Sequence, residues 1–468
     1  MSIRVTALYL LVAGLSLYAW KDWFKSLCGL ILLMAIFEHE DMPKTMFGIQ
    51  GLNLWNALFI MIALAWAFSR RREGLRWDVP RHIGWLLLLY LGVILIGVSR
   101  AVFDRSYIED YPLKSLLSEE LLNTIKWALP GLLLFDGCRT RRRTIMALVC
   151  VLAVYFLVSV QVIKFMPPGA AFGDSDALNG SRVRLGRFIG YSACDISAML
   201  AGASWGIVAA LPLVPRRRYQ LLMLAAAGVI TCGQALTGGR AGYVAWGATG
   251  LILCLLKWRK HLVLAPFVVM VLPILFPSAA SRMLSGFGET DVAGETTIND
   301  YAMTSGRTLI WPYVVQKIEE SPVIGYGRLA MERTGLCERL MKEMGESFPH
   351  PHNVYLESLL DNGILGSIPI VLFWAIITAY SAALFRSGNH LYSTVGGLAL
   401  SLTLAQLFAG IGAQHYYPRV STVGLWTAMF LMLRVHIEEK QAQLSAICAE
   451  SFWCGPLQQG ALPLCSQG

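Results

Sequence analysis

Two histidines flank a proline near the end of the longest stretch between apolar segments, in the run 348–353 (FPHPHN). The prolines on either side of His350 hold this run extended, and Asn353 is a good residue to cap a following helix. His352 would then lie at the start of that helix, where the helix dipole favours an anion. A neutral imidazole there can accept a proton from an attacking hydroxyl. Glu357 lies one turn further on and is placed to orient it.

A second set of candidates consists of arginines beside apolar segments: Arg182, Arg184, Arg187, Arg240 and Arg307. Arg240 follows a very short turn between two such segments, so it should lie at a membrane boundary. Burying a guanidinium near lipid is costly unless it has a partner or a purpose. The planar fork of arginine suits phosphate oxygens. We interpret the set as an anion site for a lipid diphosphate; the alternative is that each arginine snorkels to lipid headgroups or pairs with an acidic side chain.

The composition indicates what kind of secondary structure positions these residues. Hydrophobic residues make up 56% of the 468 residues, charged residues only 15%, and the mean hydropathy is +0.55. A soluble chain would carry about 25% charged residues. Long apolar runs recur from end to end, which excludes a soluble enzyme, a disordered protein and a protein with a single anchor. The runs are unbroken rather than alternating, which argues against a membrane β-barrel. We therefore predict an all-α polytopic membrane protein.

Thirteen apolar segments can be marked along the chain. They lie at about 5–20, 26–37, 52–68, 83–99, 121–136, 144–166, 188–213, 220–236, 241–256, 261–277, 364–385, 391–413 and 420–435. A span needs roughly 20 residues, so the second segment is short. We predict 12 to 13 transmembrane helices and prefer 12, with both ends of the chain inside.

Clusters of basic residues orient these segments. The clusters lie at 70–72 with 76 and 81, at 139–143, at 216–218 and at 257–260. Because successive spans cross the membrane in opposite directions, all of these clusters lie on the same side. We assign that side to the cytoplasm, where the basic residues that flank membrane spans usually lie. The five arginines above then lie outside, where topology does not explain them. The basic clusters beside the apolar segments also account for the formal net charge of +9. We do not interpret this charge as a nucleic-acid site, because no basic stripe lies on a soluble module.

The largest outside loop, 278–363, lies between the tenth and eleventh apolar segments. Within it, residues 329–346 have apolar residues at helical spacing, which predicts an amphipathic helix. Such a helix would rest on the membrane, cover a cavity or pack on its neighbours. We assign residues 1–435 to one transmembrane domain that includes this loop. Residues 436–468 are expected to form a poorly ordered cytoplasmic tail.

Several short motifs resemble one known family. His352-Asn353, nine residues and then Gly363-Ile364-Leu365-Gly366 resemble the motif of bacterial O-antigen ligases. The run 237–242 (TGGRAG) is similar to the Thr-x-Ser-Arg-Gly turn of the family. The runs 305–311 (SGRTLIW) and 322–327 (PVIGYG) resemble its Gly-Arg…Trp and Pro-x-x-Gly-x-Gly signature. In series, these motifs indicate the superfamily of O-antigen ligases, O-antigen polymerases and bacterial protein O-glycosyltransferases.

The resemblance implies a GT-C-type membrane glycosyltransferase of the bacterial inner membrane with its active site in the periplasm. The donor would be a glycan on undecaprenyl diphosphate, and the reaction would invert the anomeric carbon without a metal or other cofactor. Arg240 and Arg307 would stabilise the diphosphate leaving group, and His352 would activate the acceptor hydroxyl. We also assign Arg184 and Arg187 to substrate binding. His350, Asn353 and Glu357 complete the substrate-binding set.

Two features depart from this pattern. Gly239 replaces the serine that usually precedes the turn arginine, and the run 186–191 lacks the Pro-Asn that many relatives have nearby. Asp174-Ser175-Asp176 also has the Asp-x-Asp spacing with which some glycosyltransferases hold a divalent cation. We favour metal independence, because this tripeptide is common by chance in a Gly/Asn-rich loop.

The acceptor is left open by the sequence. A ligase adds a finished glycan to lipid A-core, a polymerase extends a polysaccharide such as an exopolysaccharide, and a protein glycosyltransferase modifies Ser or Thr. We rank the ligase first and the polymerase second. From a different class, a transporter of an anionic lipid-linked sugar would also place arginines in a membrane cavity. It would not explain the His/Asn/Gly series, and the paired repeats common in transporters are not found.

Overall fold

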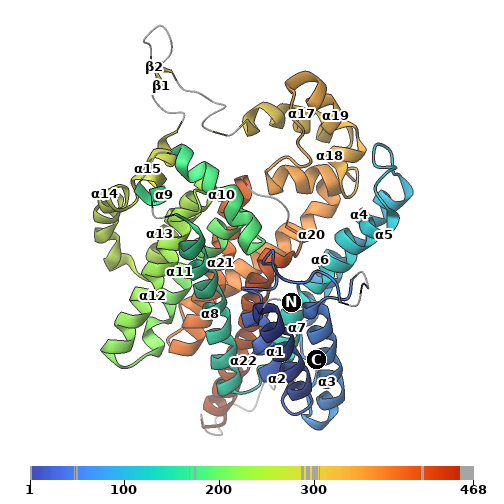
Figure 1. Cartoon of the computed structure of the whole chain (residues 1–468). Coiled ribbons are helices and arrows are strands. Elements are labelled where there is room, and N and C mark those ends of the chain that lie inside the picture. Colours follow the sequence, from blue (N-terminus) through green and yellow to red (C-terminus); the bar gives the residue numbers. More distant parts are fainter. Residues whose placement is uncertain are drawn as a thin grey trace.

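The computed structural model describes residues 3–46, 48, 51–167, 169–172, 175–285, 289–290, 296–297, 304, 306–412 and 416–453. These ranges are almost entirely helical (Figure 1). The strands described there, β1 (Glu289–Thr290) and β2 (Thr296–Thr297), pair antiparallel over two residues each. The predicted all-α polytopic fold is confirmed.

The elements follow in chain order. The first half contains α1 (Ile3–Ala19), α2 (Trp23–Leu33), α3 (Leu54–Arg72), α4 (Arg81–Phe103), α5 (Leu113–Leu116), the π-helix η1 (Leu117–Leu122), α6 (Asn123–Lys126), α7 (Leu129–Gly137), α8 (Arg141–Phe165), α9 (Gly169–Phe172), α10 (Ser175–Ile189), α11 (Ala193–Ala210), η2 (Leu211–Leu213) and α12 (Arg217–Leu236). The second half contains α13 (Arg240–Leu256), η3 (Arg259–Leu264), α14 (Ala265–Leu275), α15 (Pro277–Leu284), α17 (Arg307–Glu320), α18 (Ala330–Arg333), α19 (Leu336–Met344), α20 (Val354–Phe385), α21 (His390–Ala409), η4 (Gly410–Gly412), η5 (Val420–Thr422) and α22 (Val423–Trp453).

Seven helices in the described ranges are long and apolar enough to cross a membrane: α4, α8, α11 with η2, α12, α20, α21 and α22 with η5. The pair formed by η3–α14 and α15 is bent by 104° and would make an eighth, broken span. Helices α1, α2 and α13 are apolar but shorter. Length and composition alone thus support fewer spans than the predicted 12 to 13, because several apolar segments are divided or fall short of about 20 residues.

Helices α11, α20, α21 and α22 form the centre of the molecule (Figure 1). Small residues let their backbones approach, as in other membrane bundles. A Cβ atom on Gly202 of α11 would lie 2.7 Å from the Cα atom of Leu402 in α21. Aromatic rings fill the space between α20 and α22, where Phe373 and Trp426 stack with ring centroids 5.5 Å apart.

Helix α20 is broken at Gly363, whose φ of 60° and ψ of −170° are not helical. The run 322–327, with the Pro-x-x-Gly-x-Gly pattern, bonds to the backbone on both sides of the break. These bonds join Ile364 N to Pro322 O (2.8 Å), Leu365 N to Val323 O (3.0 Å), Tyr326 N to Leu360 O (2.9 Å) and Gly327 N to Asp361 O (2.6 Å). A Cβ atom on Gly325 would lie 2.5 Å from the backbone nitrogen of Gly363. Backbone hydrogen bonds therefore hold two of the family-like motifs together, the run 322–327 and the break at Gly363. We call this contact the joint.

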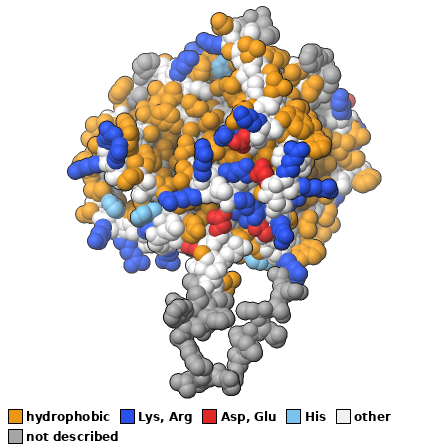
Figure 2. Space-filling model, turned by 90° about the horizontal axis from the view of Figure 1, so that it is seen from below, with side chains coloured by type: hydrophobic (Ala, Val, Ile, Leu, Met, Phe, Trp, Pro, Cys, Tyr) orange, Lys and Arg blue, Asp and Glu red, His pale blue; other side chains and the backbone are white. Residues whose placement is uncertain are grey.

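The predicted basic clusters lie together at one end of the bundle, which Figure 2 views directly. Ion pairs join the ends of several helices there: Arg70–Asp136 (3.0 Å), Arg139–Asp78 (2.7 Å), Arg143–Glu73 (2.6 Å) and Arg434–Asp78 (2.6 Å). The Asp136 side chain is fully buried, so its pairing with arginines compensates for the loss of water. This end is the one that the sequence places in the cytoplasm.

Two predicted boundaries change in the structure. The amphipathic helix 329–346 is divided into α18 and α19, because Gly335 takes a φ of 71° and packs against Tyr107. Leu336 and Leu340 are buried against α17 and α20, so this segment packs on its neighbours. The tail predicted for 436–468 begins as a continuation of α22 to Trp453; residues 454–468 lie outside the described ranges.

Candidate active site

Residues 348–353, which we call the histidine run, are held in place by hydrogen bonds from α17 and α19. The indole nitrogen of Trp311 on α17 donates to the carbonyl of Pro351 at 3.0 Å. The thiol of Cys337 on α19 donates to the carbonyl of Phe348 at 2.9 Å. The side chain of Asn353 accepts bonds from the backbone nitrogens of Tyr355 and Leu356, so it caps α20 as predicted.

His352 adopts a left-handed backbone conformation with a φ of 50°. Histidine is more tolerant of this region than most residues, but the conformation costs free energy and needs support from its surroundings. The neighbouring bond from Trp311 supplies such support. The rings of His350 and His352 meet edge to face, with centroids 4.4 Å apart.

The electrostatic surroundings keep His352 neutral. Burial, followed by repulsion from Arg307, lowers the pKa of His352 to about 4, while the attraction of Glu357 acts in the opposite direction. At neutral pH the imidazole is therefore uncharged and has a nitrogen lone pair that can accept a proton. This is the protonation state that the sequence analysis required of it.

Arg307 is the first residue of α17 and follows Gly306, whose φ of 75° turns the chain into the helix. Its side chain reaches the end of α21. A Cβ atom on Gly412 would lie 2.7 Å from Nη1 of Arg307 and 3.1 Å from the Cβ atom of Ala241. The glycine therefore leaves room for the guanidinium beside the first turn of α13.

Arg240 begins α13 directly after the Gly238-Gly239 turn, and its Nη1 donates to the carbonyl of Ser285 at 3.4 Å. The turn packs on α11. A Cβ atom on Gly239 would lie 2.5 Å from the Cβ atom of Ser197, whose hydroxyl donates to the Gly239 carbonyl at 3.1 Å. This contact explains why glycine replaces the serine of the family turn: a larger residue has no space here.

Two further arginines join Arg240 and Arg307. The positive charges of Arg307 and Arg182 repel that of Arg240, and those of Arg182 and Arg240 repel that of Arg282. Arg182 donates from Nη2 to the thiol of Cys194 at 3.3 Å, and Arg282 donates from Nε to the carbonyl of Gly238 at 3.4 Å. We call Arg182, Arg240, Arg282 and Arg307 the arginine group.

The remaining predicted arginines lie apart from this group. Arg184 and Arg187 are exposed on α10, on faces of the helix other than the one that carries Arg182. Arg282 was missing from the prediction. The signal for it was available, because it is also a basic residue on the outer side, just after the apolar segment 261–277.

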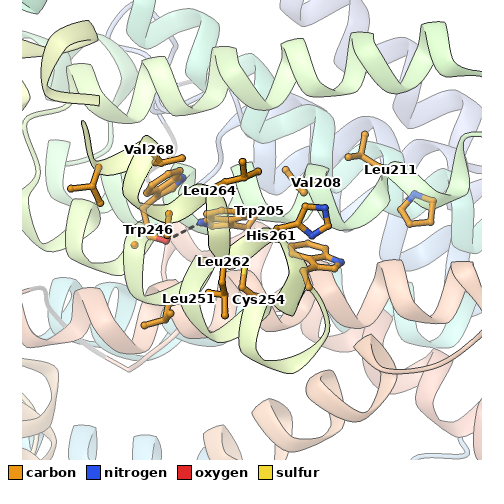
Figure 3. A pocket seen from close by; sticks show the side chains of 16 residues that line it. Trp205, Val208, Leu211, Trp246, Leu251, Cys254, His261, Leu262, Leu264 and Val268 are labelled. Atoms are coloured by element: carbon orange, nitrogen blue, oxygen red, sulfur yellow. Dashed lines mark hydrogen bonds between the residues drawn. The ribbon is translucent and has the colours of Figure 1, made fainter. Parts of the chain in front are cut away.

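An apolar cavity of about 410 Å³ adjoins the arginine group. Its lining includes Tyr243, one turn after Arg240, and Met283, directly after Arg282. A second apolar cavity of about 470 Å³ lies along α13 and α14 (Figure 3), and both cavities are lined by Trp246 and Val269. Apolar space thus extends from the arginine group along these two helices toward the basic end of the bundle.

His350 and Glu357 line a small cavity beside the histidine run. Glu357 is 6% exposed, and its charge favours the protonated form of His352, so it opposes the lowering of the His352 pKa. The structure therefore places His352 between a cationic region and an acidic one. Asp174 and the side chain of Asp176 lie outside what the structure describes. The structure therefore does not test the Asp-x-Asp alternative.

Residues 222–371 match the model of the O-antigen ligase family. The predicted resemblance to the O-antigen ligase superfamily is confirmed. The matched range contains Arg240, Arg307 and His352, the three residues predicted to be catalytic, and also Arg282. Arg182 lies before it.

Two relatives are similar to part of the chain. A protein of Rickettsia conorii, provisionally named a polysaccharide ligase, is 23% identical over 205 residues, which are 42% of this chain and 47% of the relative. A protein of Rickettsia felis with the same provisional name is 23% identical over 190 residues, 39% of this chain and 44% of the relative. The matched stretch thus covers less than half of either relative.

Proposed function

We propose that the protein is an integral-membrane glycosyltransferase of the O-antigen ligase type. It moves a glycan from an undecaprenyl diphosphate carrier to an acceptor hydroxyl on the periplasmic side of the inner membrane. The observation that carries this proposal is the juxtaposition of the arginine group with a neutral His352. The family match supports the same class of enzyme.

The arginine group has the chemistry to bind a diphosphate. Guanidinium groups present paired N–H donors to phosphate oxygens, and the resulting charge-assisted bonds are roughly twice as strong as neutral ones. As the bond between the anomeric carbon and the diphosphate oxygen breaks, negative charge grows on the leaving group. Donors already positioned there stabilise this charge more than they stabilise the intact donor, which lowers the barrier.

His352 acts on the acceptor in this displacement. The acceptor oxygen attacks the anomeric carbon from the face opposite the diphosphate, its proton passes to the imidazole, and the configuration at that carbon inverts. Binding of the anionic diphosphate offsets the repulsion that Arg307 exerts on His352. The pKa of His352 should therefore rise when the donor binds, which makes the imidazole a stronger base at the moment of transfer.

The lipid chain of the donor would occupy the two apolar cavities along α13 and α14. The chain moves into these cavities from lipid rather than from water, so close packing against their apolar side chains would hold it there. With its diphosphate at Arg240 and Arg282, the chain would follow Tyr243 and Trp246 along α13 toward the basic end of the bundle. Of the remaining predicted substrate-binding residues, His350, Asn353 and Glu357 act around the imidazole, and Arg184 and Arg187 would bind substrate outside the arginine group, from the exposed face of α10.

Reconstitution tests the proposal. The purified protein is combined with an undecaprenyl diphosphate-linked glycan and with lipid A-core, a polysaccharide primer or a periplasmic protein. We expect transfer with release of undecaprenyl diphosphate. One glycan on lipid A-core identifies a ligase, a ladder identifies a polymerase and a glycoprotein identifies a protein glycosyltransferase. Movement of the donor across a vesicle membrane without bond cleavage would instead support the transporter alternative.

Metal independence is tested in the same assay. We expect transfer to persist in EDTA, because cationic side chains supply the charge that a divalent ion would otherwise contribute. Complete loss of transfer in EDTA, with rescue by Mg²⁺ or Mn²⁺, would contradict this part of the proposal and would favour the Asp-x-Asp alternative.

A further inference from the structure

A cavity of about 390 Å³ lies between α1, α8 and the segment that follows α2. We call it the α1–α8 cavity. Its apolar lining consists of Ala7, Leu8, Leu11, Ile36, Met42 and Phe165. Its described lining contains no residue of the arginine group or of the histidine run, so the proposed function does not account for it.

The α1–α8 cavity lies away from the basic end of the bundle. Helix α8 begins within the basic cluster 139–143 and ends one residue after Lys164. Helix α1 runs the other way, because its last residues adjoin the start of α2, where Trp23 donates to Glu73 at the basic end. Arg4, in the first turn of α1, therefore lies on the outer side together with Lys164. The preferred count of 12 spans requires the first turn of α1 to be inside, so the structure differs from it here.

Two cations from different helices line this cavity. Arg4 and Lys164 are both exposed, and neither has a hydrogen bond or an ion pair within the described part of the chain. The ammonium group of Lys164 lies 5.3 Å from the centroid of the Phe165 ring. Asp41 also lines the cavity; its backbone nitrogen donates to Nδ1 of His39 at 3.2 Å, and its carboxylate lies 3.7 Å from the same nitrogen. With His39 neutral, two cations and one carboxylate leave a net charge of +1.

The order of polar and apolar residues in the cavity matches that of a phospholipid. Leu11 follows Arg4 by seven residues, which is about 10 Å along the helix. The apolar lining of α1 therefore extends from the cations toward the interior of the membrane. Snorkelling explains one basic side chain at the end of one helix. It does not explain why two helices direct their basic residues to a single cavity with an apolar floor.

We propose that the α1–α8 cavity binds one phospholipid of the outer leaflet with a single negative charge. Arg4 and Lys164 hold its phosphate, which accepts charge-assisted hydrogen bonds from both side chains. A hydrocarbon chain of the lipid packs on Phe165. The Phe165 ring stacks on Phe188 of α10, with centroids 4.9 Å apart. The bound lipid therefore supports the helix that also carries Arg182 of the arginine group.

Native mass spectrometry of the purified, delipidated protein tests the proposal. The protein in detergent is titrated with phosphatidylglycerol, or with a diacylglycerol that has the same chains but no phosphate. We expect one phosphatidylglycerol to bind saturably. The diacylglycerol should bind at least about fivefold more weakly, since each basic side chain beside an anionic lipid contributes roughly a factor of five to binding.

Two variants separate the headgroup from the chain. Arg4→Gln combined with Lys164→Gln removes both cations, whereas Ala7→Trp fills the apolar floor and keeps them. Each should weaken phosphatidylglycerol binding at least about fivefold. The matched control combines Lys114→Gln with Lys342→Gln, two exposed lysines that do not line the cavity, and should leave binding unchanged.

Equal binding of the two lipids would overturn the proposal. So would undiminished binding to Ala7→Trp, or an equal loss in the control, because phospholipid would then adsorb to the protein without a defined site. A variant that melts more than about 3 °C below the wild type without lipid is replaced under the same criteria. Lys164→Gln alone then stands for the charge variant, and Ala7→Phe stands for Ala7→Trp.

Discussion

At the scale of single residues, the site depends on cations that repel one another and on a histidine that burial, followed by repulsion from Arg307, keeps neutral. The Nη1 atom of Arg307 lies close to Gly412, beside Ala241 in the first turn of α13, and the charge of Arg307 repels that of Arg240. Like charges do not gather in this way without an energetic cost. An anionic substrate compensates for that cost at the point where leaving-group charge develops.

We predict that Arg240→Ala, Arg307→Ala and His352→Ala each reduce transfer by at least about 10²-fold, the usual effect of removing one preorganised donor. Arg307→Lys should also lose much of its activity, because lysine has no bidentate fork. Transfer is measured on purified protein, with membrane insertion checked by fractionation. Arg142→Ala, an exposed arginine at the basic end, is the control. Near-normal transfer by all three alanine variants would refute the site.

The pH dependence follows from the lowered pKa of His352. Since this pKa is about 4, the free enzyme should lose its base only as the pH falls toward 4, and kcat/KM should show no acid step near 6.5. Removing the positive charge in Arg307→Gln raises the pKa, so the acid limb of the residual activity should move to higher pH. Arg307→Lys retains the charge and should keep the limb in place. A wild-type limb near 6.5 would contradict this prediction.

The histidine and three members of the arginine group, Arg182, Arg240 and Arg307, could be predicted from sequence, because their residue types and their places beside apolar segments limit what they can do. Arg282 was missed, since one basic residue after an apolar run resembles a topology signal. The proximity of His352 to Arg307 joins residues 45 positions apart, and only the folded loop brings them together. Similarly, no sequence pattern revealed that Arg4 and Lys164 share a cavity.

At the scale of secondary-structure elements, the joint between the run 322–327 and the break in α20 determines where the histidine run can lie. The part of α20 before Gly363 carries Asn353 as its cap and Glu357 in its first turn. Backbone bonds hold this part against the loop. The glycines of the joint therefore act on the site by positioning it.

We predict that Gly363→Ala destabilises the protein. Its φ of 60° and ψ of −170° lie in a region that is essentially restricted to glycine, and strain of this kind costs about 1–3 kcal/mol. A Cβ atom would also lie 2.5 Å from the nitrogen of Ile324. Thermal unfolding in detergent should show a melting temperature several degrees lower. Gly388→Ala, where a Cβ atom meets open space, is the matched control; equal melting temperatures for the two variants would argue against a strained joint.

Helical periodicity predicted that the segment 329–346 is helical, but not that it is divided into the two helices α18 and α19. Leu336 and Leu340 are buried as their spacing indicated. The division at Gly335 results from a contact with Tyr107, more than 200 positions earlier in the chain, and local spacing cannot reveal such a contact.

At the scale of the whole molecule, the predicted separation of charge is clear. The basic clusters gather at the end that Figure 2 views, and the arginine group lies at the other end of α12 and α13, whose course Figure 1 shows. Counting apolar segments predicted the class of fold and this polarity. The count of 12 to 13 spans stays a prediction, because the apolar run 121–136 folds as several short pieces, 261–277 runs into the bent pair η3–α14 and α15, and α1, α2 and α13 are apolar but short.

We predict that the two apolar cavities select for lipid length. Val269→Trp places an indole where they meet, so the half-saturating concentration of a long polyprenyl donor should rise at least fivefold. A donor with a short isoprenoid chain should be much less affected. Leu222→Trp, an exposed position on α12, is the control. Equal effects of Val269→Trp on long and short donors would exclude the cavities as the site of the lipid chain.

The crowding of four cations around one turn has a consequence for handling the protein. Inorganic pyrophosphate presents the donor headgroup without sugar or lipid, and any anion that binds only the folded state raises its stability by mass action. The melting temperature in detergent should therefore climb with pyrophosphate concentration and level off at saturation, and Arg240→Ala should flatten this curve. Buffers rich in multivalent anions are, on this basis, the natural choice for keeping the purified enzyme intact.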